Sequence, residues 1–275
     1  MKDGRTSTKV SAGARFRALH ERPGVFAIPN PWDVGSARVL EGLGFEALAT
    51  TSAGFAFSVG RRDYGVPRDA MLAHAAVLVG ATDLPVSADL ENGFGDAPET
   101  VAETIRLAAA TGLAGGSIED STRRPDAPIY ELAHAVDRIR AAAEVARSLP
   151  APFVLTGRAE NFLHGRRDLA DTIARLQAYQ EAGAEVLYAP GLRSEQEIAS
   201  VVRSVDRPVN VIPLPTMELD LARLEALGVK RVSVGSALAR LALGAFLRGA
   251  RELREQGTFG FVREALSSAE ANGLF

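Results

Sequence analysis

Short apolar stretches rich in β-branched residues alternate with amphipathic helical stretches along most of this 275-residue chain. Several helical stretches close with a glycine that leads into the next apolar stretch, as in "EGLGFEAL" and "EALGVKRVSV". Glycine suits the left-handed position that ends a helix, and the short link suits an α-to-β connection. The stretches that we expect to form strands are residues 24–30, 46–52, 85–91, 114–120, 153–161, 185–191, 208–214 and 231–236. Eight strand-then-helix units predict a parallel sheet closed into a (β/α)8 TIM-type barrel.

The alternative to a closed barrel is an open, doubly wound sheet. It is disfavoured because no G-x-G-x-x-G follows the first predicted strand and no change of composition marks a second domain. We therefore expect residues 1–275 to form a single barrel domain. Residues 240–275 hold more apolar helix than closing the barrel requires, so we expect extra C-terminal helices that make contacts between subunits.

The composition of the chain excludes several classes of partner and of chemistry. The net charge is −3 and the charged residues are spread along the sequence, which argues against nucleic acid or an anionic membrane as a partner. Neither a signal peptide nor a membrane-spanning apolar run is visible, so a cytoplasmic location is expected. The chain has no cysteine, which excludes disulfides, thiolate metal ligands and a thiol nucleophile or acid.

Polar side chains gather at the predicted strand ends, which is where the active sites of such barrels lie. In "PVSADLENGFGD", Asp89 and Glu91 follow an apolar strand at alternate positions, so both carboxylates point to one side. The other strand ends carry Asn30, Asp33, Thr51, Ser52, Glu119, Asp120, Arg158, Glu160, Asn161 and Asn210. Clustered carboxylates repel one another unless a cation lies among them, and oxygen ligands without cysteine favour Mg²⁺ or Mn²⁺.

Each of these residues also has a structural interpretation. Asp89 can cap a turn, Asn92-Gly93 can form a hairpin turn, and Glu119 can pair with Arg158 for stability alone. In the functional interpretation, the guanidinium fork of Arg158 suits a substrate carboxylate or phosphonate. A structural origin for the whole set requires several independent coincidences, so we favour a metal and oxyacid site.

These motifs, in their order along the chain, resemble those of the isocitrate lyase/phosphoenolpyruvate mutase superfamily from about Pro29 to the last helix. "IPNPWDVGSARVLEGLGFEAL" is similar to the opening segment of that superfamily. The segments that resemble its strand ends two to five are "TTSAGFAFSVGRRD", "SADLENGFG", "GGSIED" and "LTGRAENF". The resemblance implies a barrel, a divalent metal, a small carboxylate substrate, and a homodimer or homotetramer in which the last helix is exchanged between subunits.

The resemblance also implies roles for individual residues. Asp89 would ligate the metal directly, Glu91 would reach it through water, and Glu119 would belong to the same metal shell. Asp63 would be the acid that closes the strand-two motif. The predicted substrate contacts are Thr51, Ser52, Ala53, Asn92, Gly93, Arg158, Glu160 and Asn210, and the predicted catalytic residues are Asp63, Arg123, Arg124 and Arg158.

The loop after strand four departs from the superfamily pattern. Lyases of the superfamily carry a K-K-C-G-H loop there, and phosphoryl-transferring members carry Lys and Asn. This chain reads "IEDSTRRPDAPIY", with neither cysteine nor lysine, so we expect Arg123 or Arg124 to hold a second substrate carboxylate.

The different loop does not affect the part of the mechanism that the whole superfamily shares, in which a bound metal stabilises an enolate. We therefore expect a Mg²⁺-dependent lyase or decarboxylase that acts on C–C bonds of small 2-oxo or 2-hydroxy di- or tricarboxylic acids through a metal-stabilised enolate. Such an enzyme would be isocitrate lyase-like, methylisocitrate lyase-like or oxaloacetate decarboxylase-like. The alternatives are a C–P bond enzyme of the phosphoenolpyruvate mutase or phosphonopyruvate type, and a non-catalytic barrel that binds 2-oxo acids.

Overall fold

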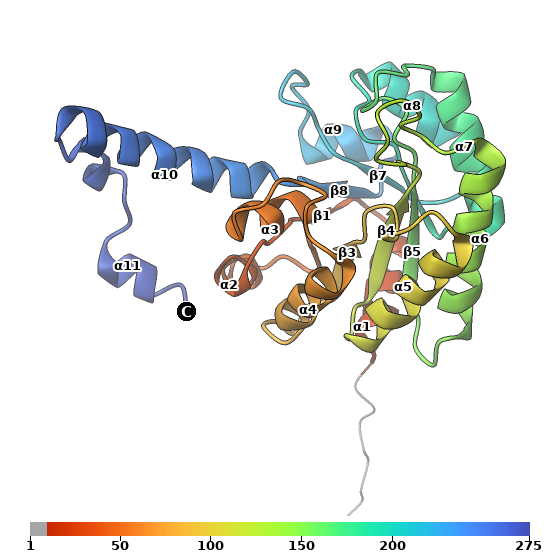
Figure 1. The fold of residues 1–275 in the computed structure, drawn as a ribbon, viewed down its shortest axis with the longest axis horizontal. Coiled ribbons are helices and arrows are strands. Elements are labelled where there is room, and N and C mark those ends of the chain that lie inside the picture. The colour runs from red at the N-terminus through yellow and green to blue at the C-terminus, as the bar shows by residue number, and fades with distance from the viewer. Residues whose placement is uncertain (1–9) are drawn as a thin grey trace, which may run out of the picture.

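The computed structural model describes residues 10–275, and residues 1–9 of the predicted domain lie outside the described part. The sheet has eight parallel strands in the spatial order β1-β8-β7-β6-β5-β4-β3-β2. The strands are β1 (Phe26–Ile28), β2 (Leu48–Ala49), β3 (Val86–Asp89), β4 (Gly115–Glu119), β5 (Val154–Arg158), β6 (Val186–Tyr188), β7 (Val209–Val211) and β8 (Arg231–Ser233). Each lies inside one of the eight predicted ranges. A hydrogen bond of 3.0 Å from Ala49 N to Pro29 O links the ends of the two outer strands, so the predicted (β/α)8 barrel is confirmed (Figure 1).

Helices surround this sheet, except for the last three, which extend away from it (Figure 1). They are α1 (Ala12–Glu21), α2 (Val34–Gly42), α3 (Ser52–Ser58), α4 (Arg68–Val79), α5 (Pro98–Ala110), α6 (Leu132–Ser148), α7 (Leu169–Ala182), α8 (Glu195–Arg203), α9 (Leu221–Ala226), α10 (Ala237–Gln256), the 3₁₀ helix η1 (Gly260–Arg263) and α11 (Ser268–Asn272). Local signals explain several boundaries. Asp33 caps α2 by accepting from Ser36 N at 2.7 Å, and Gly183 ends α7 with φ at 111°.

The interior of the barrel changes character from one end to the other. At the N-terminal ends of the strands, Phe16 and Leu19 of α1 pack against an apolar cluster that includes Phe26, Val154 and Val186. Barrel interiors are usually filled by Val, Ile and Leu. Nearer the C-terminal ends, however, the inward-facing residues are small or polar, namely Ser87, Ser117, Thr156, Asn210, Arg231 and Ser233. The upper half of the barrel is therefore open enough to hold a ligand.

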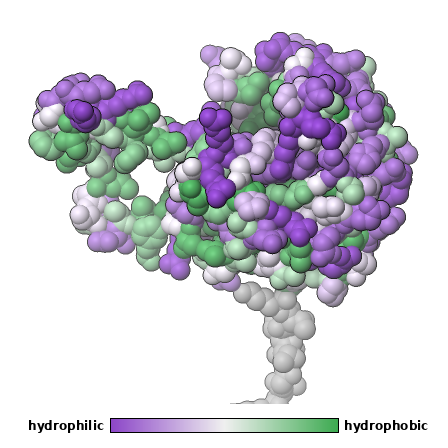
Figure 2. All heavy atoms as spheres, viewed as in Figure 1, coloured by the Kyte–Doolittle hydropathy of each residue, from purple (hydrophilic) through white to green (hydrophobic). Residues whose placement is uncertain are grey.

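The C-terminal segment leaves the barrel. Helix α10 runs outward as an arm of 20 residues, and η1 and α11 turn back from its far end (Figure 1). Phe275 returns to α2, where its ring lies 3.8 Å from the position that a Cβ on Gly35 would occupy. The arm exposes large apolar side chains, with Phe246 at 72% exposure and Leu241 at 65% (Figure 2). The expected extra C-terminal helices are thus present and leave an apolar face uncovered within residues 10–275.

None of the helices in the described part of the chain is both long enough and apolar enough to cross a bilayer.

Candidate active site

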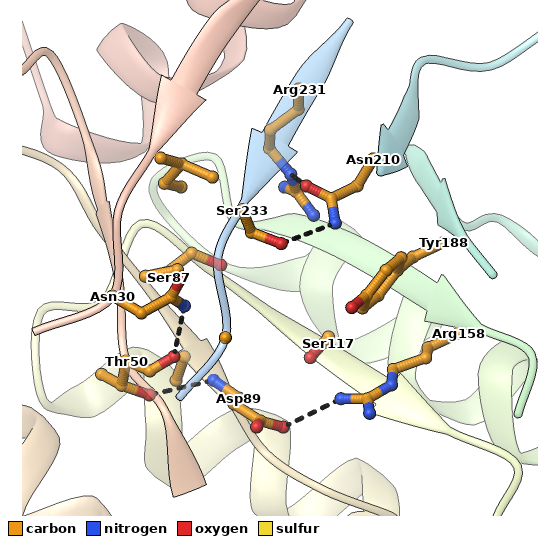
Figure 3. Close-up of a pocket in the computed structure, with 14 residues that line it drawn as sticks. Asn30, Thr50, Ser87, Asp89, Ser117, Arg158, Tyr188, Asn210, Arg231 and Ser233 are labelled. Carbon is orange, nitrogen blue, oxygen red and sulfur yellow. Dashed lines mark hydrogen bonds and ion pairs between the residues drawn. The ribbon is translucent and has the colours of Figure 1, made fainter. Parts of the chain in front are cut away.

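Asp89 stands at the end of β3, where the barrel opens. Its Oδ2 atom accepts hydrogen bonds from Ser52 Oγ at 2.9 Å and from Ser52 N at 3.4 Å. Its Oδ1 atom lies 3.6 Å from Arg158 Nη1 and accepts from Glu91 N at 3.2 Å (Figure 3). Thr50 supports the strand end by accepting from Asp89 N at 3.0 Å. The Asp89 carboxylate is therefore held between β2 and β5 rather than turned to solvent.

Arg158, at the end of β5, is the cation among the strand-end acids. Its Nη1 atom lies 3.4 Å from Glu119 Oε2, and its Nε donates to Glu160. The guanidinium carbon lies 5.1 Å from the centre of the Tyr188 ring. Burial alone would lower the pKa of Arg158, but Glu160 and Glu119 outweigh it and hold that pKa well above its usual value. The guanidinium is therefore charged at any working pH.

The surrounding carboxyl groups outnumber the guanidiniums that contact them. Burial raises the pKa of Glu91 to about 8, against the opposing effect of Arg123. Burial also raises the pKa of Glu119 well above its usual value, and that of Asp63 with help from Asp89. The carboxylates are those of Asp63, Asp89, Glu91, Glu119 and Glu160, and the guanidiniums that contact them are those of Arg123 and Arg158. Fully ionised, five acids against two cations would leave a surplus of negative charge at the pocket mouth, and the raised pKa values indicate that some of these acids hold protons instead.

This donor set fits a hard divalent cation. Glu91 Oε1 is buried without a hydrogen-bond partner, while Glu91 Oε2 is paired with Arg123. Within residues 10–275, no three or more His, Cys, Asp or Glu side chains converge as a closed metal cage. Mg²⁺ does not require such a cage, because it keeps several waters and uses one or two carboxylates. Asp89 and Glu91 are the residues that would hold it.

Arg123 closes the mouth of the site from the loop after β4. Its guanidinium carbon lies 4.9 Å from the centre of the Tyr64 ring and 5.6 Å from that of Phe94, and it pairs with Glu91. Tyr64, Glu91, Phe94 and Arg123 have φ values of 59°, 51°, 63° and 62°, and they are the non-glycine residues with positive φ in the described chain. Such backbone geometry costs energy and concentrates at functional sites. The four strained residues meet at one point.

Arg124, the neighbour of Arg123, takes a different position. Its Nη1 donates to Asp96 Oδ2 at 2.8 Å, and its side chain is 51% exposed. The left-handed backbone at Arg123 turns that side chain inward while Arg124 stays on the outer rim. Of the two arginines that the sequence left open, the structure brings Arg123 into the site and leaves Arg124 beside it.

The remaining predicted residues of the β2 segment surround the start of α3. Thr51 caps this helix by accepting from Gly54 N at 3.2 Å, and Ser52 and Ala53 form its first residues. Ser52 Oγ also lies 3.3 Å from Asp63 Oδ1, so the closing acid of the motif reaches the same serine as Asp89. Ser52 therefore connects Asp63 to Asp89, while Ala49 and Thr50 are the residues of this segment that line the pocket.

Asn92 and Gly93 shape the turn after β3. Asn92 Oδ1 accepts from Phe94 N at 3.2 Å, and Gly93 has φ at 75°. Arg138 of α6 donates to the carbonyls of Asn92, Gly95 and Asp96 and so fixes the loop from behind. Asn92 and Gly93 therefore act in the turn, which leads from β3 to α5 and is not a hairpin turn, because β3 and β4 are parallel.

Asp120, next to Glu119, points away from the pocket. Its carboxylate accepts from Glu160 N at 2.8 Å, Tyr179 Oη at 2.6 Å and Arg175 Nη1 at 3.1 Å. This buried network anchors the segment after β5, and with it Glu160, to helix α7. Asp120 therefore supports the site without lining it.

Sequence reasoning missed two residues of the site. Tyr64 Oη donates to Glu119 Oε1 at 2.8 Å, and Arg231 lines the floor of the pocket. A basic residue at the start of an apolar strand, as in "RVSVG", is the signal that identifies Arg231 as unusual. Tyr64 carries no such signal, since it stands in a polar loop beside Asp63.

A pocket runs from the mouth down into the barrel. Its cavity volume is about 60 Å³, so it has room for a small ligand only. Figure 3 shows Asp89 and Arg158 on one side of it and Arg231, Asn210 and Ser233 on the other. The pocket is lined by Asp89, Arg158 and Arg231 at the C-terminal face of a (β/α)8 barrel, which is where the active sites of barrel enzymes lie.

Comparison with known proteins gives the family. Residues 16–254 match the phosphoenolpyruvate phosphomutase family, so the chain belongs to that family. An uncharacterized protein of Mycobacterium tuberculosis is 35% identical over 222 residues, which cover 80% of this chain and 81% of the relative. Further relatives, 27% to 32% identical, are 2-methylisocitrate lyases and an oxaloacetate decarboxylase.

Solved structures agree with this assignment. A candidate lyase/mutase of Burkholderia cenocepacia is 63% identical with a TM-score of 0.92, covering 95% of this chain and 94% of that one. A 2,3-dimethylmalate lyase of the PEP mutase/isocitrate lyase superfamily is 26% identical with a TM-score of 0.86, covering 97% and 95%. The resemblance seen in the sequence is confirmed, and the chain is an enzyme of this superfamily of lyases and mutases.

Proposed function

We propose that the protein is a Mg²⁺- or Mn²⁺-dependent lyase or decarboxylase that cleaves a C–C bond of a small 2-oxo or 2-hydroxy di- or tricarboxylic acid. The observation that carries this proposal is the surplus of carboxyl groups over guanidiniums at the pocket mouth, together with the unpartnered Oε1 atom of Glu91. A cation offsets that surplus and gives a carboxylate substrate a reason to bind there. Related lyases act on 2,3-dimethylmalate and 2-methylisocitrate.

Several residues would bind and orient the substrate. When bound, the metal supplies positive charge to the oxygens of a 2-oxo acid, which favours the electron-rich state that follows bond cleavage. Arg158 presents a charged fork beside Asp89 for a carboxylate. Ser52 offers a backbone N–H and a hydroxyl, both of which already donate to a carboxylate, that of Asp89. Together these donors would hold one acidic group of the substrate at the mouth.

The loop after β4 presents Arg123 at the site, where the lyases of the superfamily present a cysteine that acts as an acid. With Tyr64 and Phe94 on either side, Arg123 covers Glu91 and helps to exclude water. The loop from 121 to 131 holds no cysteine or lysine. Decarboxylation needs few groups beyond an electrophilic site, so this loop supports decarboxylation more directly than a cleavage that requires a loop acid.

The family match keeps C–P chemistry as the second candidate, because the matched family is described as a phosphomutase. We also propose that the protein is a homo-oligomer, either a dimer or a tetramer. In it, the apolar face of α10 packs on a second subunit and the C-terminal helix is exchanged between subunits. The exposed Phe246 and Leu241 support this arrangement.

Turnover of a defined panel tests the proposal. The full-length protein is incubated with Mg²⁺ and oxaloacetate, isocitrate, 2-methylisocitrate, 2,3-dimethylmalate or phosphonopyruvate, and products are followed by mass spectrometry. We expect at least one carboxylic acid to be cleaved, and cleavage to stop on chelation. Turnover of phosphonopyruvate alone would favour the second candidate, and no turnover at all would refute the proposal.

Two arginine variants, one at the site and one control, make this test sharper and distinguish an enzyme from a non-catalytic 2-oxo acid binder. Arg123→Gln should lower turnover at least about tenfold, since it removes a charged group from the mouth. Arg140, an exposed residue of α6 paired with Asp137, offers a matched control, and Arg140→Gln should have no such effect. Metal-dependent binding that survives in Arg123→Gln without turnover separates catalysis from simple binding.

A further inference from the structure

Arg231 is the first residue of β8 and points into the barrel. Only 5% of its surface is exposed. Its Nε donates to Asn210 Oδ1 at 2.8 Å and its Nη2 donates to Thr156 Oγ1 at 3.1 Å. Its Nη1 lies 3.3 Å from His20 Nε2. None of these partners is a carboxylate.

His20 is neutral in this arrangement and so brings no counter-charge. Its Nδ1 lies 2.8 Å from Phe16 O, which can only accept, so Nδ1 carries the hydrogen and Nε2 accepts from Arg231. Burial, together with Arg231, lowers the pKa of His20 to about 3. Burial lowers the pKa of Arg231 itself to about 10, which leaves it charged at neutral pH. No ion pair is formed by Arg231 within residues 10–275.

A buried charge without a counter-charge is costly, and this layer of a barrel is normally filled with apolar side chains. Arg231 lies at the floor of the pocket whose mouth holds Asp89 and Arg158. Figure 3 shows its guanidinium beside Asn210 and near Ser233, across the pocket from Asp89. Its unbalanced positive charge is thus placed where a ligand can reach it.

The two pocket arginines belong to one row of the sheet. The strand registers pair Arg158 with Tyr188, Tyr188 with Asn210, and Asn210 with Arg231. Three strand spacings of about 4.8 Å put the ends of this row about 14 Å apart along the sheet. Neutral hydrogen-bonding groups lie between the two cations, among them Asn210 and Ser233, which bond to each other at 3.0 Å.

We propose that Arg231 binds a second acidic group of the substrate at the pocket floor, with Asn210 and Ser233 as positioning residues. The enzyme then selects 2-oxo or 2-hydroxy acids with two acidic groups over monocarboxylates. This inference rests on the proposed function, which places the first acidic group beside Arg158. It assigns the second group to the barrel interior rather than to Arg123, whose guanidinium is already paired with Glu91.

Binding of ligands that the enzyme is not expected to cleave tests this assignment. Calorimetric titrations of the full-length protein with Mg²⁺ compare pyruvate, which has one carboxylate, with 2-oxoglutarate and 2-oxoadipate, which have two. We expect at least one dicarboxylate to bind about tenfold or more tightly than pyruvate. In Arg231→Gln, its affinity should fall about 10- to 100-fold while that of pyruvate changes less than about threefold. Arg231→Lys should retain part of the preference, and Arg140→Gln all of it.

The outcomes separate this inference from the proposed function. If pyruvate and the dicarboxylates bind equally, or if Arg231→Gln weakens both equally, the assignment fails while the metal-dependent 2-oxo acid site stands. If no 2-oxo acid binds, both fail. If inorganic phosphate alone binds as tightly as the dicarboxylate and depends equally on Arg231, the floor is an inorganic-anion site and the substrate assignment is wrong.

A wild-type crystal keeps the test decisive if the Arg231 variants do not fold. The crystal is grown with Mg²⁺ and the dicarboxylate that binds most tightly. Density for a carboxylate on the Arg231 guanidinium supports the proposal. Density for both carboxylates at the mouth, with the floor empty, overturns it.

Discussion

Glu91 makes the stability of the metal-free protein depend on pH in an unusual direction. Its side chain is buried, and one of its oxygens has no partner. Burial raises the pKa of Glu91 from an ordinary 4.5 to about 8, even though Arg123 opposes the shift. Between these values the folded protein holds a proton that the unfolded chain has released. The free energy of unfolding therefore falls as the pH rises through this window.

The size of the effect follows from the width of the window. One proton difference gives a slope of about 1.4 kcal/mol per pH unit. Across the range from 4.5 to about 8 the loss reaches at most about 5 kcal/mol, complete only above the folded-state pKa. Asp63 and the buried Glu119 and Glu160 have raised pKa values too and act in the same direction. Replacing Glu91 alone isolates its contribution to the pH dependence of the free energy of unfolding.

Urea denaturation in the presence of a chelator, from about pH 5 to about pH 7.5, measures this effect. Glu91→Gln keeps the size of the side chain but cannot titrate, so its slope should be shallower than that of the wild type by about 1.4 kcal/mol per pH unit. Glu103→Gln, on the outer face of α5, is the control and should follow the wild type. Saturating Mg²⁺ should flatten the wild-type slope, because binding favours the ionised carboxylate. Parallel slopes for the wild type and Glu91→Gln would refute the reasoning.

Two further predictions concern the support of the site and the arm. Asp120→Asn removes the anion that binds Tyr179 and Arg175, so the free energy of unfolding should fall by about 3–5 kcal/mol in urea denaturation. A change under about 1 kcal/mol would show that this network is not an anchor. Phe246→Glu places a charge on the exposed apolar face of α10 and should reduce the molar mass measured by light scattering. Arg248→Glu on the same helix should leave it unchanged, and equal masses for both variants would contradict the oligomer contact.

The fold was predictable because its signals are local. Each strand is a short apolar stretch followed by a helix, several of these helices end next to a glycine, and eight repeats leave few topologies. The charged residues at the strand ends were predictable for a related reason. The carboxyl ends of parallel strands lie at one face of the barrel, so Asp89, Glu119 and Arg158 lie at that face. The structure places Arg158 within 3.6 Å of Asp89 and 3.4 Å of Glu119.

Other features depend on contacts that no local pattern contains. Arg123 and Arg124 are adjacent and chemically identical, and only the left-handed backbone at Arg123 sends the two side chains to different places. Arg231 meets His20 across 211 residues, so its setting in the barrel interior appears only after folding.

The four strained residues at the mouth have a consequence for anyone who seeks to improve this protein. Left-handed backbone at a non-glycine residue costs about 1–2 kcal/mol, and glycine would relieve it at Tyr64, Glu91, Phe94 or Arg123. A screen for heat resistance would therefore favour these positions, and every success would delete a side chain that covers the pocket entrance. Selection for catalytic rate, run in parallel, would restore them. Laboratory evolution of this enzyme should meet its conflict between robustness and activity at this point of the chain.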